Sequence, residues 1–178
     1  MKSKLIFLLF LTLLFLACSG ETKKTAYVNP FIGTGAHGHT FPGATTPYGM
    51  VQLSPDTRVG NWDACSGYHY SDSGILGFSH THLSGTGSID LGDLLIRPTL
   101  RSLSSIVADE KITTTSFKHL NEVATPGYYK VLLDEESITC ELTVTPRTGI
   151  HRYSFPDGVQ SNIIMDLSHE LYNETAEL

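Results

Sequence analysis

The chain has 178 residues, with 40% hydrophobic and 10% aromatic side chains and a formal net charge of −6. An acidic balance of this size argues against nucleic acid as a partner and against electrostatic adhesion to an anionic membrane surface. Three cysteines are too few for a disulfide framework, so one modest hydrophobic core must stabilise the chain.

Residues 1–17 are predicted to be a signal peptide. Two lysines precede residues 5–16, an uncharged and largely apolar stretch of twelve residues that is shorter than the roughly 20 residues that a membrane-spanning helix needs. Because a cysteine follows a small residue at its end, Cys18 is the predicted lipidation site of a bacterial lipoprotein, and residues 18–26 form a polar tether. We expect an exported protein of the periplasm or outer membrane that contacts the membrane only through this lipid. A plain secreted protein is the alternative.

The segment that follows, residues 28–93, is rich in turn signals. Eleven of the sixteen glycines and five of the eight histidines lie between Gly33 and Gly87. Strands are expected over 48–54 and 92–97, with long loops over 60–90. Loops of that length are uncommon in compact domains unless they carry function, so this half of the chain is predicted to build a site from loops.

The second half has the pattern of an antiparallel sheet. Strands are predicted over 127–133, 138–144, 150–155 and 162–167, separated by turn clusters. Within 138–144 the apolar residues alternate with polar ones, which indicates a half-buried strand. No segment has a helical period. The fold class is therefore all-β, an antiparallel β-sandwich over residues 27–178. Six or seven strands are too few to complete two sheets, so the sandwich is expected to be incomplete at the C-terminus.

Two His-x-His pairs stand out among the candidate ligands, the first His37/His39 and the second His80/His82. Alternate residues of a strand share a face, so His80 and His82 could bind one metal ion together with Asp90 or Asp93, as in cupin-like proteins. The carboxylate expected shortly after the pair is missing, because residues 83–87 contain none. Histidines that hydrogen-bond loop backbone are the alternative interpretation.

The dipeptide Trp62-Asp63 is a candidate sugar-recognition element. An indole stacks on the apolar face of a sugar ring, and a carboxylate accepts hydrogen bonds from hydroxyl pairs. A tryptophan buried in the sandwich core is the alternative, although the neighbours Asn61, Asp63 and Ser66 are polar. No pair of carboxylates in this half is singled out by spacing as an acid and a base.

The chain resembles the N-terminal domain of glycoside hydrolase family 92, the exo-acting α-mannosidases. The resemblance covers nearly all of residues 27–169 and rests on these stretches: VNPFIGTGAHGHTFPGATTPYGMVQLSPDT, WDACSGYHYSDSGILGFSHTHLSGTG, PGYYKVLLD, ELTVTPRTGIHRYSFP and IIMDLSH. It implies a two-domain enzyme with an (α/α)6 catalytic domain, absent from this chain, that holds the general acid, the general base and a calcium ion. No catalytic residue and no metal ligand is therefore assigned within this chain.

What the resemblance carries over is the contribution of the sandwich loops to the sugar pocket. Trp62 is expected to stack on the sugar and Asp63 to bind hydroxyls, while the first His-x-His pair lines the rim or the domain contact. The predicted substrate-binding residues are Trp62, Asp63, Cys65, Ser66, His80, His82, Ser84, His37 and His39. Ala64 and Ser88 depart from the family pattern, which leaves the linkage preference open.

These inferences combine into one functional hypothesis and two alternatives. The chain is predicted to be a fragment of a calcium-dependent, inverting exo-α-mannosidase. Its partners would be a mannose-containing glycan and its own C-terminal catalytic domain. One alternative is a stand-alone surface glycan-binding lipoprotein, which would bind mannose without hydrolysing it. A cupin-like metal protein would instead hold metal at a His-x-His pair.

Overall fold

The computed structural model describes residues 23–108 and 113–172. The predicted signal peptide, the lipidation site Cys18 and the start of the tether lie outside these ranges. Across the part of the chain that is described, no helix has the length and apolar character needed to cross a membrane.

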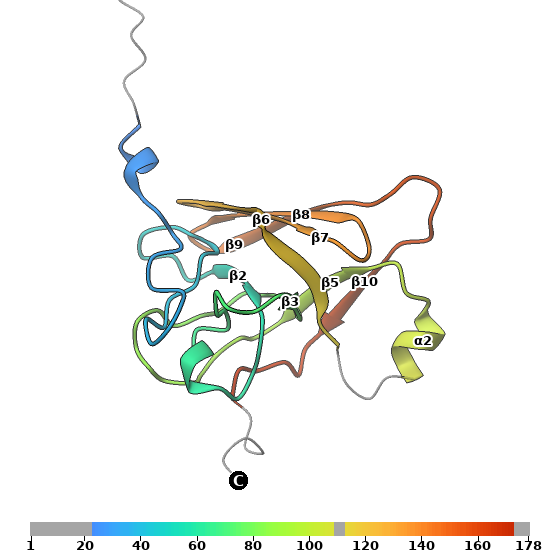
Figure 1. The fold of residues 1–178 in the computed structure, drawn as a ribbon, viewed down its shortest axis with the longest axis horizontal. Helices are drawn as coiled ribbons and strands as arrows, with labels where there is room; N and C mark the ends of the chain where they lie inside the picture. The colour runs from blue at the N-terminus through green and yellow to red at the C-terminus, as the bar shows by residue number, and fades with distance from the viewer. Residues whose placement is uncertain (1–22, 109–112, 173–178) are drawn as a thin grey trace, which may run out of the picture.

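Two antiparallel five-stranded sheets pack against each other, which confirms the predicted all-β sandwich (Figure 1). The first sheet has the order β1 (Ala44–Thr45), β2 (Gln52–Asp56), β4 (Gly77–Ser79), β5 (Leu95–Thr99) and β10 (Asn162–Asp166). The second has the order β3 (Gly74–Ile75), β6 (Thr115–Thr125), β7 (Tyr128–Leu133), β8 (Ile138–Thr145) and β9 (Thr148–Ser154). The helical segments are short: η1 (Lys24–Tyr27), η2 (Trp62–Ala64) and α2 (Leu103–Ala108).

The hydrophobic core lies between the two sheets and draws on both. Strand β8 shows how the sequence builds it: Ile138, Cys140 and Leu142 are buried, while the residues between them are not. The first sheet contributes Leu53 and Phe78, both fully buried. Side chains from successive strands therefore interdigitate in the manner that the alternating pattern predicts.

Strand β6 was not predicted, and its irregularity explains why. The register with β7 shifts between Phe117 and Glu122, so the alternation of apolar and polar residues is broken there. The bulge turns the Glu122 carboxylate inward, where it accepts hydrogen bonds from Tyr129 Oη at 2.6 Å and Tyr68 Oη at 3.0 Å. A buried carboxylate in a strand removes the local signal on which the prediction depends.

Two expected strands differ in their limits from the observed ones. Strand β2 begins at Gln52 rather than at Tyr48, because residues 46–49 form a turn in which Tyr48 has φ +57°. Strand β5 continues through Pro98 to Thr99, beside the edge strand β10. In β10 the outward side chains of Ile163 and Met165 are more than half exposed, at 57% and 59%.

Residues 28–43, 57–73 and 80–94, which we call the loop cluster, gather at one end of the sandwich (left in Figure 1). Backbone hydrogen bonds join these loops to one another, from Tyr70 N to Thr34 O at 2.8 Å and from Gly85 N to His39 O at 2.6 Å. The loops are thus fixed relative to each other by the sandwich and by their own backbone, and they present side chains from distant parts of the sequence together.

Candidate functional site

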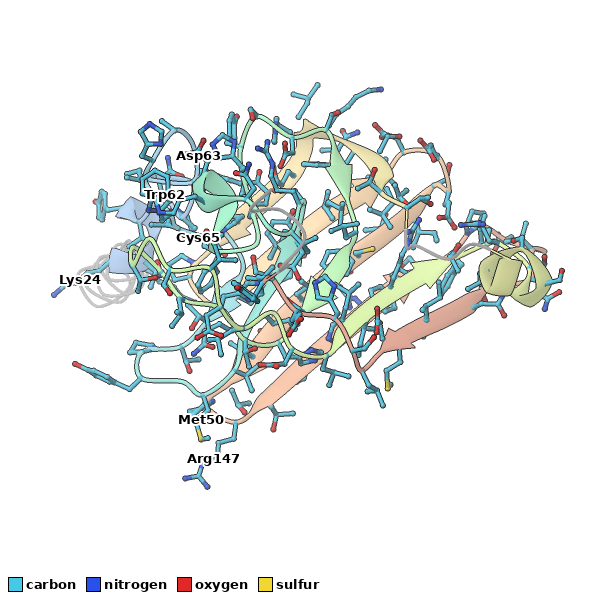
Figure 2. All side chains as sticks on the ribbon, turned by 90° about the horizontal axis from the view of Figure 1, so that it is seen from below. Lys24, Met50, Trp62, Asp63, Cys65 and Arg147 are labelled. Atoms are coloured by element: carbon cyan, nitrogen blue, oxygen red, sulfur yellow. The ribbon has the colours of Figure 1, made fainter. Side chains whose placement is uncertain are left out.

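Trp62 and Asp63 lie on the short helix η2, at the surface of the loop cluster (Figure 2). Asn61 caps this helix by accepting a hydrogen bond from Ala64 N. Trp62 is 52% exposed, yet its Nε1 donates to Gly87 O at 2.9 Å, which fixes the orientation of the indole. An exposed aromatic face held in place by a hydrogen bond is suited to stacking on a ligand.

The first His-x-His pair joins this dipeptide from another loop. His37 Nδ1 lies 2.5 Å from Asp63 Oδ1, across a separation of 26 residues in sequence. The ring of His39 meets the Trp62 indole edge-on, with 4.3 Å between the ring centroids. The structure therefore brings together four of the predicted site residues: Trp62, Asp63, His37 and His39.

Cys65 and Ser66 lie directly beneath this surface rather than on it. Both are buried, and burial raises the pKa of the Cys65 thiol. Cys65 and Cys140 are both free thiols, so they form no disulfide with each other.

His82, Asp56 and His169 form a buried hydrogen-bonded network, which we call the latch. His82 Nδ1 lies 2.7 Å from Gln52 O, and its Nε2 lies 2.8 Å from Asp56 Oδ1. His169 Nε2 meets the other carboxylate oxygen of Asp56 at 2.9 Å. Burial alone would raise the pKa of Asp56, but the charge of His82 and the hydrogen bonds from His169 and His82 lower it to about 2. The latch ties the first sheet to the segment that follows β10.

His80 also bonds inward, whereas Ser84 lies at the surface. His80 Nδ1 lies 2.8 Å from Leu94 O, and its Nε2 lies 3.2 Å from His151 Nε2. Ser84 is exposed and lines an open groove of about 510 Å³ together with Thr40 and Phe41. His80 and His82 thus bond within the domain, as the alternative interpretation of the sequence has it, whereas Ser84 is exposed.

Sequence reasoning did not select Asp56, His169 or Gly87. Asp56 and His169 are 113 residues apart, and no local pattern connects them. Gly87 contributes its backbone carbonyl and the space beside His39, where an added Cβ would lie 3.3 Å from the ring Nδ1. These roles depend on which segments the fold brings together, so the sequence around each residue does not predict them.

One group in the described ranges has the donor atoms for a metal ion: His37, His39 and Asp63. Each offers one ligand atom, and these atoms lie within 4.8 Å of one another. Calcium takes six to eight oxygen ligands, so a set with two imidazoles does not suit it. These residues therefore do not fit the calcium ion that the family resemblance implies.

The fold defines an all-β sandwich domain with long loops gathered at one end. Residues 27–177 match the family described as "Glycosyl hydrolase family 92 N-terminal domain", and the chain belongs to this family. The family predicted from the sequence is thereby confirmed.

Solved structures and a curated protein agree with this assignment. The family GH92 α-mannosidase BT3965 from Bacteroides thetaiotaomicron, solved also in complex with mannoimidazole, shares 40% identity over 85% of this chain and 20% of that protein, with a TM-score of 0.76. The family GH92 inverting mannosidase BT2199 from Bacteroides thetaiotaomicron VPI-5482 shares 30% identity over 82% of this chain and 20% of that protein, with a TM-score of 0.65. An "uncharacterized secreted glycosidase" from Arthroderma benhamiae is 32% identical, over 85% of this chain and 21% of that protein. The chain thus spans about a fifth of the length of each of these relatives.

Proposed function

We propose that this chain is the N-terminal domain of an exo-acting α-mannosidase and that its loop cluster contributes to the pocket for a terminal mannose. The observation that carries the proposal is an exposed aromatic face beside an accessible carboxylate. Trp62 is 52% exposed, and the side chain of Asp63 is 39% exposed. A sugar ring stacks on an indole and donates hydroxyl hydrogen bonds to a carboxylate. The identity of 40% to an α-mannosidase solved with mannoimidazole supports mannose as the sugar.

In this proposal, hydrolysis takes place on a second domain outside this chain. An inverting glycosidase needs two carboxyl groups roughly 6.5–9.5 Å apart, with room for a water molecule. Two carboxylates near the site are paired with histidines: Asp56, at the end of β2, is buried between His82 and His169, and Asp63 bonds His37. The (α/α)6 domain of the family would supply the acid, the base and the calcium ion for a single displacement. This chain would bind the sugar and dock onto that domain.

The location that we propose is the cell envelope, reached by export and held by a lipid on Cys18. The description of one relative as secreted supports export. Incorporation of labelled palmitate into the protein, and its loss in Cys18→Ser, tests the anchor. Processing of the signal without any incorporation would instead indicate a plain secreted protein.

Kinetic analysis of the whole protein encoded in frame with this chain tests the proposed function. We expect mannose to be released from an α-linked mannobiose, and Trp62→Ala to lower kcat/KM by about 30-fold, since the loss of stacking and burial is worth about 2 kcal/mol. The matched control is Tyr48→Ala, which removes a fully exposed aromatic side chain of the domain. Tyr48 is two residues from Met50, which Figure 2 shows well away from Trp62, so this change should alter kcat/KM by less than about twofold.

Two results would contradict different parts of the proposal. If Trp62→Ala leaves kcat/KM unchanged, η2 is not part of the sugar pocket, although the enzyme assignment stands. If the whole protein binds mannose but releases none from any α-mannoside, the enzyme assignment fails. The glycan-binding lipoprotein would then be the better description.

A further inference from the structure

Three potential metal ligands converge at the surface of the loop cluster. His37 and His39 come from the loop that follows Gly33, and Asp63 comes from η2. Their ligand atoms lie within 4.8 Å of one another. We infer that His37, His39 and Asp63 form a binding site for a divalent transition-metal ion, with Zn²⁺ as the reference ion. The inference goes beyond the proposed mannosidase function and does not depend on it.

The burial of His39, with one ring nitrogen unpartnered, is a second and independent observation in favour of a bound ligand. The residue is only 8% exposed, and its Nε2 is buried with no hydrogen-bond partner in the described structure. Buried polar atoms in proteins nearly always have a partner, because leaving one unsatisfied costs stability. A cation coordinated through this nitrogen would satisfy it.

The donor set indicates the class of metal. Two imidazoles and one carboxylate match three-ligand zinc sites, which keep a fourth position open for water or for an oxygen of a ligand. Imidazole nitrogen favours zinc, copper, nickel and iron over calcium and magnesium. His37 and His39 both lie against the indole of Trp62, with 5.3 and 4.3 Å between ring centroids, so the metal ion would lie next to this ring.

Metal binding would require the exposed side chains of His37 and Asp63 to move, because the three ligand atoms now lie within 4.8 Å of one another rather than at the spacing of a tetrahedral site. Zinc–ligand bonds of about 2.0–2.2 Å place tetrahedral ligand atoms about 3.3 Å apart. His37 Nδ1 and Asp63 Oδ1, now 2.5 Å apart in a hydrogen bond, would separate by under an ångström as the metal replaces the shared proton. The side chains of His37 and Asp63 are 70% and 39% exposed, so both can move without disturbing the core.

The second His-x-His pair does not offer a comparable site. Both ring nitrogens of His82 bond within the core, to Gln52 O and to Asp56. Both ring nitrogens of His80 are likewise engaged, with Leu94 O and His151. A metal ion at this pair would have to displace these bonds, whereas His39 Nε2 of the first pair has no partner in the described structure.

Metal analysis of the untagged protein tests the inference. After equilibration with Zn²⁺ and removal of loosely bound ion, we expect about one zinc per chain by elemental mass spectrometry. Cobalt as a substitute should give the visible absorption of a tetrahedral site. Asp63→Asn and His39→Asn should each weaken zinc affinity by more than the 10–100-fold that losing an outer-shell partner costs. Asparagine is chosen for His39 because it tolerates the φ of +54° found there.

The matched control is Asp90→Asn, the same change at an exposed aspartate that belongs to the competing His80–His82 arrangement. It should leave the zinc content at one per chain. The inference is overturned if the folded protein holds no zinc above the buffer level. It is equally overturned if zinc is lost in Asp90→Asn but kept in Asp63→Asn. Asp63 is partly exposed, so Asp63→Asn decides the matter even if His39→Asn does not fold.

Discussion

Acidification is predicted to destabilise the domain through a pair of histidines that joins the two sheets. His151 on β9 and His80 directly after β4 face each other, with 3.2 Å between their Nε2 atoms. His80 Nδ1 must carry a proton, because its partner Leu94 O can only accept. A doubly protonated pair would point two N–H groups at each other. The pair is therefore incompatible with full protonation.

The magnitude follows from the shifted titration of His151. Burial, with a contribution from the charge of His80, lowers the pKa of His151 from 6.5 to about 4. The unfolded chain takes up this proton as pH falls through 6.5, while the folded chain does so only near pH 4. The stabilisation is thus complete above pH 6.5 and is lost as pH falls toward 4. It amounts to about 3 kcal/mol in full, of which about 2 kcal/mol is lost by pH 5.

Urea unfolding followed by circular dichroism at pH 7 and pH 5 measures this effect. In His151→Gln the titrating group is absent, so the stability difference between wild type and variant should shrink by about 2 kcal/mol from pH 7 to pH 5. The control His69→Gln removes a histidine from a surface turn, where it contacts Ser71 and Ala36 O. Its stability difference from wild type should change by less than about 0.5 kcal/mol over the same range. A constant difference between wild type and His151→Gln would refute the reasoning.

Three further outcomes are expected from the buried parts of the domain. Asp56→Asn should lower the unfolding free energy at pH 7 by about 3 kcal/mol in urea titrations, because two buried charge-assisted hydrogen bonds are lost; a loss below about 1 kcal/mol would show that the latch is not stabilising. Gly67→Ala should lower the melting temperature more than Gly85→Ala does, although both glycines have positive φ. An added Cβ would lie 2.1 Å from Asp56 Oδ1 at Gly67 and would meet nothing within 4 Å at Gly85; equal melting temperatures would contradict this. Cys65 and Cys140, whose thiol pKa values are raised by burial, should react with a chromogenic thiol reagent only after denaturation, and rapid labelling of the folded protein would count against their burial.

The strands that were predicted well are those whose signals are local. The predicted strands 127–133 and 138–144 agree with β7 and β8 to within one residue at each end. An alternating pattern between two turn clusters contains everything needed to place such a strand. Strand β6 lacked this signal because its bulge buries Glu122 beside two tyrosine hydroxyls. That pairing exists only once β7 and the loop containing Tyr68 have packed against it.

The sequence by itself determined the sandwich class, the turn-rich first half, the family and the nomination of Trp62 and Asp63, which are adjacent in the chain. It could not settle what either His-x-His pair does, since the spacing of a pair does not show which partners each imidazole meets. The tertiary structure decided that one pair bonds within the domain, through Asp56 and His151, while the other meets Asp63 at the surface. The physical reason is that the state of an imidazole depends on its burial and on its partners. Those partners are brought to it from 26 to 71 residues away by the packing of strands and loops.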